Sequence, residues 1–107
     1  MMWRIWSLFL FSMATIANAT GGGVTAMRQA ELRNIVIQDC GSCHGLTLKG
    51  GLGKPLLPKT LKAFPDAAVA DIILDGVSGT PMPPWRGLLT ETEALWIART
   101  LKQEANP

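Results

Sequence analysis

Apolar residues recur every three or four positions in three stretches of the chain, the spacing of an amphipathic helix. The first stretch contains Leu32, Ile35 and Val36. It therefore predicts a helix that runs up to the cysteine at position 40.

The second stretch predicts a short helix that opens at Pro65-Asp66. Gly76 follows the last apolar residue, and a glycine there favours a left-handed cap at the C-terminus of a helix. We expect this helix to bury one face, made of Val69, Ile72 and Ile73.

The third stretch predicts the last helix. Thr90 followed by Glu93 is a capping-box signature for its start. Its apolar stripe consists of Ala94, Ile97, Ala98 and Leu101. No alternating pattern indicates a strand, so the predicted fold class is all-α, with three or so helices.

Two segments between these helices lack periodicity and are expected to be loops. Residues 41–64 are rich in glycine, proline and lysine, with turn signals at Gly50-Gly51 and Pro55. A loop of this length usually wraps a functional feature. The second loop holds residues 80–85, TPMPPW.

The N-terminus has the pattern of an export signal. Arg4 precedes an apolar run over residues 5–16, and Ala17-Asn18-Ala19 is a small-x-small cleavage site. A membrane anchor is the alternative, but the run is shorter than the roughly 20 residues that span a bilayer. We expect a cleaved signal peptide at 1–19, a periplasmic mature domain at 20–107 and no stable membrane insertion.

The mature chain is small and almost neutral. Removing 19 of the 107 residues leaves 88, enough for one domain with a modest core that a cofactor can complete. Arg4 leaves with the signal, so nine basic residues face eight acidic ones. This balance indicates no nucleic-acid partner.

The chemistry is concentrated in Cys40-Gly41-Ser42-Cys43-His44. In Cys-x-x-Cys-His the two thiols bond covalently to one haem and the histidine binds its iron. The motif predicts one haem c, held by Cys40 and Cys43, with His44 as an axial iron ligand.

Three other kinds of site could also use these cysteines. A structural zinc site needs four ligands, and the mature chain offers two cysteines and one histidine. A simple disulfide leaves the histidine unexplained. A thioredoxin-like thiol-disulfide oxidoreductase using Cys40 and Cys43 is the strongest alternative, but that fold needs a sheet.

The second axial ligand is predicted to be methionine, because His44 is the only histidine. The mature chain keeps Met27 and Met82. Met82 is favoured because Pro81, Pro83 and Pro84 restrict the backbone around it. His44 and Met82 together leave iron six-coordinate, which favours an electron carrier over an enzyme.

Two sets of side chains could assist this role. Trp85 and Arg86 are candidates to bind a haem propionate, and the alternative is a packed tryptophan beside a surface arginine. The loop lysines could steer docking onto an acidic partner or could simply be solvated. They are Lys49, Lys54, Lys59 and Lys62.

The order of haem motif, proline-flanked methionine and final amphipathic helix resembles the class I cytochromes c. Segments 40–53 (CGSCHGLTLKGGLG) and 79–86 (GTPMPPWR) are similar to cytochrome c55X, encoded beside cytochrome cd1 nitrite reductase in denitrifying bacteria. The resemblance implies a periplasmic carrier that supplies this reductase, or assists maturation of its d1 haem. An upstream cytochrome or quinol-oxidising complex would reduce it; a terminal oxidase or dehydrogenase is an alternative partner.

The chain departs from the class I pattern at two places. Lys54 separates the loop glycine from Pro55, so the carbonyl that accepts from the histidine is left open between these two residues. Where the first helix usually has a small residue at its crossing with the last, this chain has Leu32. We expect a looser crossing or one that uses Ala30.

Overall fold

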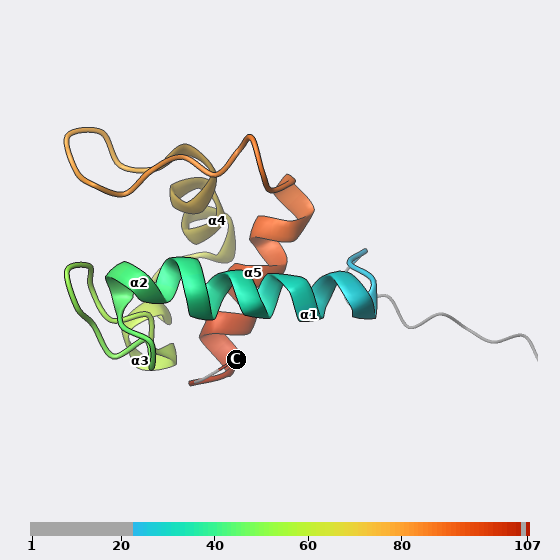
Figure 1. Cartoon of the computed structure of the whole chain (residues 1–107), viewed down its shortest axis with the longest axis horizontal. Coiled ribbons are helices and arrows are strands. Elements are labelled where there is room, and N and C mark those ends of the chain that lie inside the picture. Colours follow the sequence, from blue (N-terminus) through green and yellow to red (C-terminus); the bar gives the residue numbers. More distant parts are fainter. Residues whose placement is uncertain (1–22, 106) are drawn as a thin grey trace, which may run out of the picture.

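The fold is an all-helical domain, seen in a computed structural model that describes residues 23–105 and 107 (Figure 1). The predicted signal peptide at 1–19 lies outside this range. No β-strand occurs in the described residues, and the all-α prediction is confirmed. Nor is any helix in this part of the chain long and apolar enough to cross a membrane.

The first helical segment is one continuous rod with three parts. These are α1 (Ala26–Ile35), a π-helical turn η1 (Val36–Cys40) and α2 (Gly41–His44). The Thr25 side chain caps its start by accepting from the Arg28 N–H. Short π-helical turns occur often at functional sites, and this one leads directly into the two cysteines.

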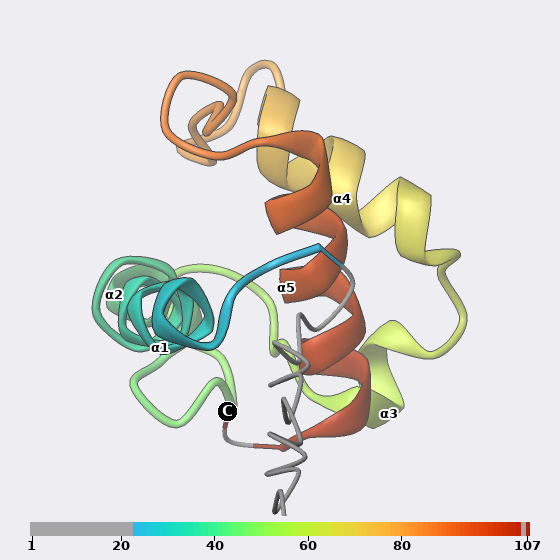
Figure 2. The same cartoon turned by 90° about the vertical axis from the view of Figure 1, so that its right-hand side faces the viewer.

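The remaining helices are α3 (Pro58–Leu61), α4 (Asp66–Asp75) and α5 (Glu91–Gln103). Figure 2 shows α4 lying along α5 while the α1–α2 rod passes beside them. All four residues of the predicted stripe on α5 are buried, and the Thr90–Glu93 capping box is present. The predictions for the last helix are confirmed.

The predicted loop over residues 41–64 contains two short helices. Residues 41–44 continue the first rod as α2, and α3 begins at Pro58. Proline is favoured in the first turn of a helix because its missing N–H has no partner there anyway. The prediction of an uninterrupted loop was therefore wrong at both ends.

The prediction for the buried face of α4 is confirmed in part. Val69 is buried and Ile73 is partly buried against the core, as predicted, whereas Ile72 is 45% exposed. Ala70 and Leu74, which were not predicted, are buried as well. Apolar residues surround most of this short helix, so periodicity alone did not select the side that packs on α5. Gly76 does cap α4, with a φ of 65°.

On α1 Leu32 is fully buried, whereas Ala30 is exposed. Leu32 belongs to the same core cluster as Ala94 and Ala98 of α5, which are also fully buried. The core thus combines a large side chain on α1 with small side chains on α5. The expectation of a crossing through Ala30 was wrong.

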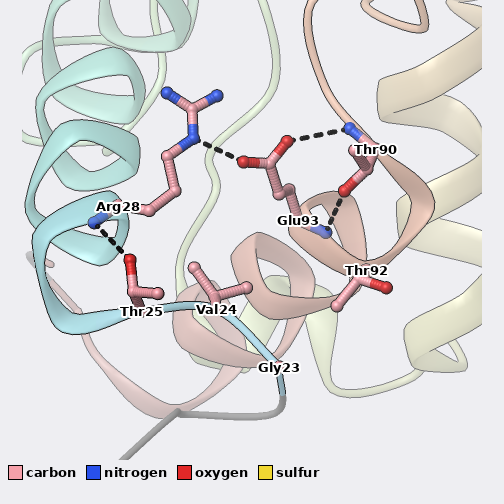
Figure 3. A pocket seen from close by; sticks show the side chains of 7 residues that line it. All are labelled: Gly23, Val24, Thr25, Arg28, Thr90, Thr92 and Glu93. Carbon is pink, nitrogen blue, oxygen red and sulfur yellow. Dashed lines mark hydrogen bonds and ion pairs between the residues drawn. The ribbon is translucent and has the colours of Figure 1, made fainter.

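A shallow pocket lies where α1 and α5 begin (Figure 3). There the Glu93 carboxylate accepts from the Arg28 guanidinium and from the Thr90 backbone N–H, at 2.9 Å for the latter. Arg28 and Glu93 are 65 residues apart in the chain, so this ion pair connects the starts of α1 and α5. This pocket is at the opposite end of α1 from the cysteines (Figure 1), and its polar groups bind each other.

Candidate functional site

The cysteines and the histidine lie together at the end of the first rod. Cys40 closes the π-helical turn, and Cys43 and His44 end α2. All three side chains are partly buried, and both thiols are free. Helical spacing places His44 one turn after Cys40, so this short segment presents two thiols and an imidazole from one surface.

The His44 ring is held by the loop that follows it. Its Nδ1 lies 2.6 Å from the backbone carbonyl oxygen of Lys54. With Nδ1–H donating to this carbonyl, Nε2 is the ring nitrogen left to bind a metal. The acceptor that the sequence left open between two residues is therefore Lys54 and not Pro55.

Glycines allow the loop to approach the histidine closely. A Cβ on Gly53 would lie 2.7 Å from the His44 ring, and one on Gly51 would lie 2.8 Å from the Cys43 carbonyl oxygen. The Gly53 N–H also donates to that carbonyl at 2.8 Å. Sequence reasoning read this glycine-rich stretch as turns and missed that it packs on the ring.

Met82 lies on the second loop, which joins α4 to α5. Figure 1 shows this loop and α2 at the same end of the molecule. The Met82 side chain is partly buried. Met27, the other candidate, is 77% exposed near the start of α1, at the opposite end of the rod. The structure therefore separates the two methionines by position.

Trp85 and Arg86 have partners within the chain. Trp85 is partly buried and packs against the core. The Arg86 guanidinium pairs with Asp75 at 2.8 Å and with Glu91 at 3.5 Å. The hydrogen bond to Asp75 is the main reason why the pKa of Arg86 is raised. These contacts favour the interpretation of Arg86 as a surface ion pair.

The Cys40 thiol is not activated in the way that a thiol-disulfide catalyst requires. Burial, followed by the charge of Asp39, raises the pKa of this thiol to about 11. A catalytic cysteine needs a lowered pKa, because the thiolate is the nucleophile. Together with the absence of strands in residues 23–105, this argues against a thioredoxin-like site.

The donor set fits a covalently attached haem. Two free thiols precede an imidazole whose Nδ1 is already bonded, which is the arrangement that haem attachment through Cys-x-x-Cys-His uses. In the described part of the chain no group of three or more His, Cys, Asp or Glu side chains, these three included, could hold a metal ion by itself. Cys40, Cys43 and His44 are the residues that would hold the group.

The loop lysines are the uncompensated cations of the described chain. Five other basic side chains form ion pairs with carboxylates: Arg28, Arg33, Arg86, Arg99 and Lys102. Within residues 23–105 the following exposed lysines form none: Lys49, Lys54, Lys59 and Lys62. We call these four the lysine patch; segment 45–65, which carries it, contains no acidic residue.

Comparison with known proteins gives one consistent family. The family model described as "Cytochrome C oxidase, cbb3-type, subunit III" matches residues 27–99. "Cytochrome c55X" of Paracoccus denitrificans is 50% identical over 91 residues, covering 85% of this chain and 88% of the relative. "Cytochrome c55X" of Pseudomonas aeruginosa is 49% identical over 83 residues, covering 77% and 70%.

Solved structures agree with the sequence relatives. The "c-type cytochrome NirC" superposes with a TM-score of 0.74 at 48% identity, covering 77% of this chain and 98% of that one. A smaller part of "Dihydro-heme d1 dehydrogenase NirN in complex with DHE" also matches, with a TM-score of 0.60, 33% identity and coverage of 65% and 15%. The chain therefore belongs to the cytochrome c55X family of small c-type cytochromes and carries a covalently attached haem c.

Proposed function

We propose that this protein is a periplasmic carrier of single electrons whose haem iron is bound by His44 and Met82. The observation that carries the proposal is that the only histidine has Nε2 left for a metal, while Met82 lies on a loop at the same end of the molecule. The bound haem supplies a reversible one-electron couple. Two protein ligands would leave no iron position for a substrate.

The residues around the site would hold the proposed ligands. The Lys54 carbonyl orients the His44 ring. Carbonyl hydrogen bonding of this kind also makes a ligand imidazole more basic. A ligand set that does not rearrange between oxidation states suits a protein that only accepts and releases electrons.

We propose cytochrome cd1 nitrite reductase as the electron acceptor, with a role in maturation of its d1 haem as the second candidate. The likeness to proteins named cytochrome c55X supports the first. The second is supported by the 37% identity over 57 residues with a protein named dihydro-heme d1 dehydrogenase, of which the match covers 12%. An upstream cytochrome or quinol-oxidising complex would supply the electron.

The lysine patch is proposed as the docking surface for an acidic partner. Four lysines without ion pairs in one segment create a local positive potential, although the whole mature chain is almost neutral. Such a patch accelerates encounter with an acidic surface, and salt reduces the effect.

The test is stopped-flow oxidation of the reduced protein by purified cytochrome cd1 at several salt concentrations. The double variant K49Q/K59Q should slow association by about tenfold at low salt, because electrostatic steering changes on-rates by 10 to 1000-fold. The control is N34D/Q103E, which changes net charge equally at exposed positions outside the patch. If the two variants associate at equal rates, the lysine patch is not the docking surface. If the protein is oxidised faster by a terminal oxidase, or reacts with a dehydrogenase instead, cytochrome cd1 is not the partner.

A further inference from the structure

The loop that carries Met82 closes on itself through side-chain and backbone hydrogen bonds. The Met82 N–H donates to Thr80 Oγ1 at 3.3 Å, and the Thr80 hydroxyl donates to the Val77 carbonyl oxygen at 2.7 Å. The Val77 N–H donates in turn to the Met82 carbonyl oxygen at 3.2 Å. Both backbone polar groups of Met82 therefore have partners within its own loop.

Prolines make the Thr80 hydroxyl the important acceptor in this loop. Pro81, Pro83 and Pro84 have no backbone N–H, so Met82 is the only residue of segment 81–84 that can donate one. Among the described residues its acceptor is Thr80 Oγ1. Without that hydroxyl, the loop could close only through the backbone bonds at Val77.

Gly76 allows the Met82 backbone to lie directly against the end of α4. A Cβ at Gly76 would lie 2.6 Å from the Met82 carbonyl oxygen and 2.8 Å from backbone atoms of Pro83 and Pro84. These are main-chain atoms, so a rotamer change cannot relieve the collision. Any side chain here must push the methionine segment away from α4.

Gly79, three residues later, provides a contrast. Its φ of 77° and the 65° of Gly76 are both positive, so both positions favour glycine. A Cβ at Gly79 would meet nothing within 4 Å. A side chain at Gly79 would therefore share the unfavourable φ without pushing on Met82.

The far end of the loop returns to the same helix. The Trp85 and Arg86 N–H groups both donate to the Leu74 carbonyl oxygen, each at 3.0 Å. Residues 76–86 thus form a closed hook whose two ends are fixed on the last turn of α4. The position of Met82 is therefore set by hydrogen bonds within the hook and between the hook and the last turn of α4.

We propose that Gly76 and Thr80 are positioning residues for Met82, which set the distance of the thioether from the end of α4. This inference rests on the proposed role of Met82 as an iron ligand. Gly76 sets the distance by the absence of a side chain, and Thr80 maintains it by bonding the Met82 N–H. If the hook were displaced, the Met82 thioether would bind the iron less well, and an added ligand would replace it more easily.

The first test compares G76A with G79A in the haem-bearing protein, by titration of the ferric form with imidazole. Both substitutions place a side chain at a positive φ, so G79A is the control for that effect without the collision with Met82. G76A should bind imidazole about tenfold more tightly than G79A, and should lose intensity in the far-red charge-transfer absorption of the iron–thioether bond. Denaturant midpoints of the two variants report whether global stability accounts for the difference.

The second test compares T80V with T80S and does not depend on recovery of folded G76A. T80V keeps the shape but lacks the hydroxyl, so it should bind imidazole about three- to tenfold more tightly, whereas T80S should match the parent. Equal affinities within both pairs would overturn the positioning role.

The variant M82A distinguishes a failure of the positioning role from a failure of the proposed role of Met82 as an iron ligand. If M82A keeps the charge-transfer absorption and the parent's imidazole affinity, Met82 is not the ligand and the proposed function fails. If M82A loses both while G76A matches G79A and T80V matches T80S, only the positioning role fails.

Discussion

The loops after His44 and after α4 hold their proposed ligands in different ways. The first, residues 45–57, packs main chain against main chain around the ring: Gly53 and Gly51 leave no room for side chains, and Lys54 bonds Nδ1. Leu48 in the same loop is fully buried. In the second loop, residues 76–86, the backbone N–H groups that form hydrogen bonds donate to the end of α4 or within the loop, and most of the residues are exposed.

This difference indicates which ligand is easier to displace. Moving His44 requires disruption of a crowded loop with a buried anchor, in addition to the covalent attachment at both cysteines. Moving Met82 requires the loss of a few exposed hydrogen bonds, each worth about 0.5–1.5 kcal/mol. Segments with few buried contacts open at low free-energy cost, so we expect added ligands to enter on the methionine side.

The largest effect should come from Met82→Ala, which removes the more easily displaced of the two proposed ligands. The reduction potential should fall by on the order of 0.1 V, within the roughly 0.8 V range that axial ligands control. Exogenous imidazole should then bind readily. Spectroelectrochemistry and imidazole titration measure both quantities, with Met27→Ala as the control because that side chain is exposed at the other end of the rod. An unchanged potential would contradict the assignment of Met82.

An intermediate effect should come from Gly53→Ala, which tests how the loop of residues 45–57 holds the His44 ring. The new Cβ would lie 2.7 Å from the His44 ring, so the ring must move and weaken its bond to Lys54. Overpacking of this kind costs about 1–3 kcal/mol, which denaturant unfolding of the haem-bearing protein would show.

The control for Gly53→Ala is Gly87→Ala, where an added Cβ meets nothing within 4 Å. Haem content after expression provides a second readout, because a displaced histidine should reduce cofactor retention. If both variants unfold at the same denaturant concentration, the glycine does not support the ring.

The smallest effect should come from Arg86→Leu. Its guanidinium pairs with Asp75 and Glu91 at the surface, where exposed ion pairs contribute little to stability. We therefore expect the reduction potential and its dependence on pH to stay as they are. A shifted potential, or a changed pH dependence, would instead indicate that Arg86 acts on a haem propionate.

Local features of the fold could be predicted because each depends on residues close together in sequence. Thr90 and Glu93 form their capping box within one turn, and Gly76 caps α4 two residues after its last apolar residue, Leu74. The face of α4 could be predicted only in part, since apolar residues surround the helix and its packing buries Ala70 and Leu74 while Ile72 stays exposed. The order of the haem motif likewise needs only five consecutive residues.

The sequence by itself determined the chemistry of this protein: two thiols, one histidine and a proline-flanked methionine in a helical chain. Tertiary structure decided how each ligand is held. Lys54 reaches His44, and Gly76 lies against Met82, only because the intervening loops turn back on themselves. Such contacts depend on the path of the main chain in space, which the pattern of apolar and polar side chains does not encode.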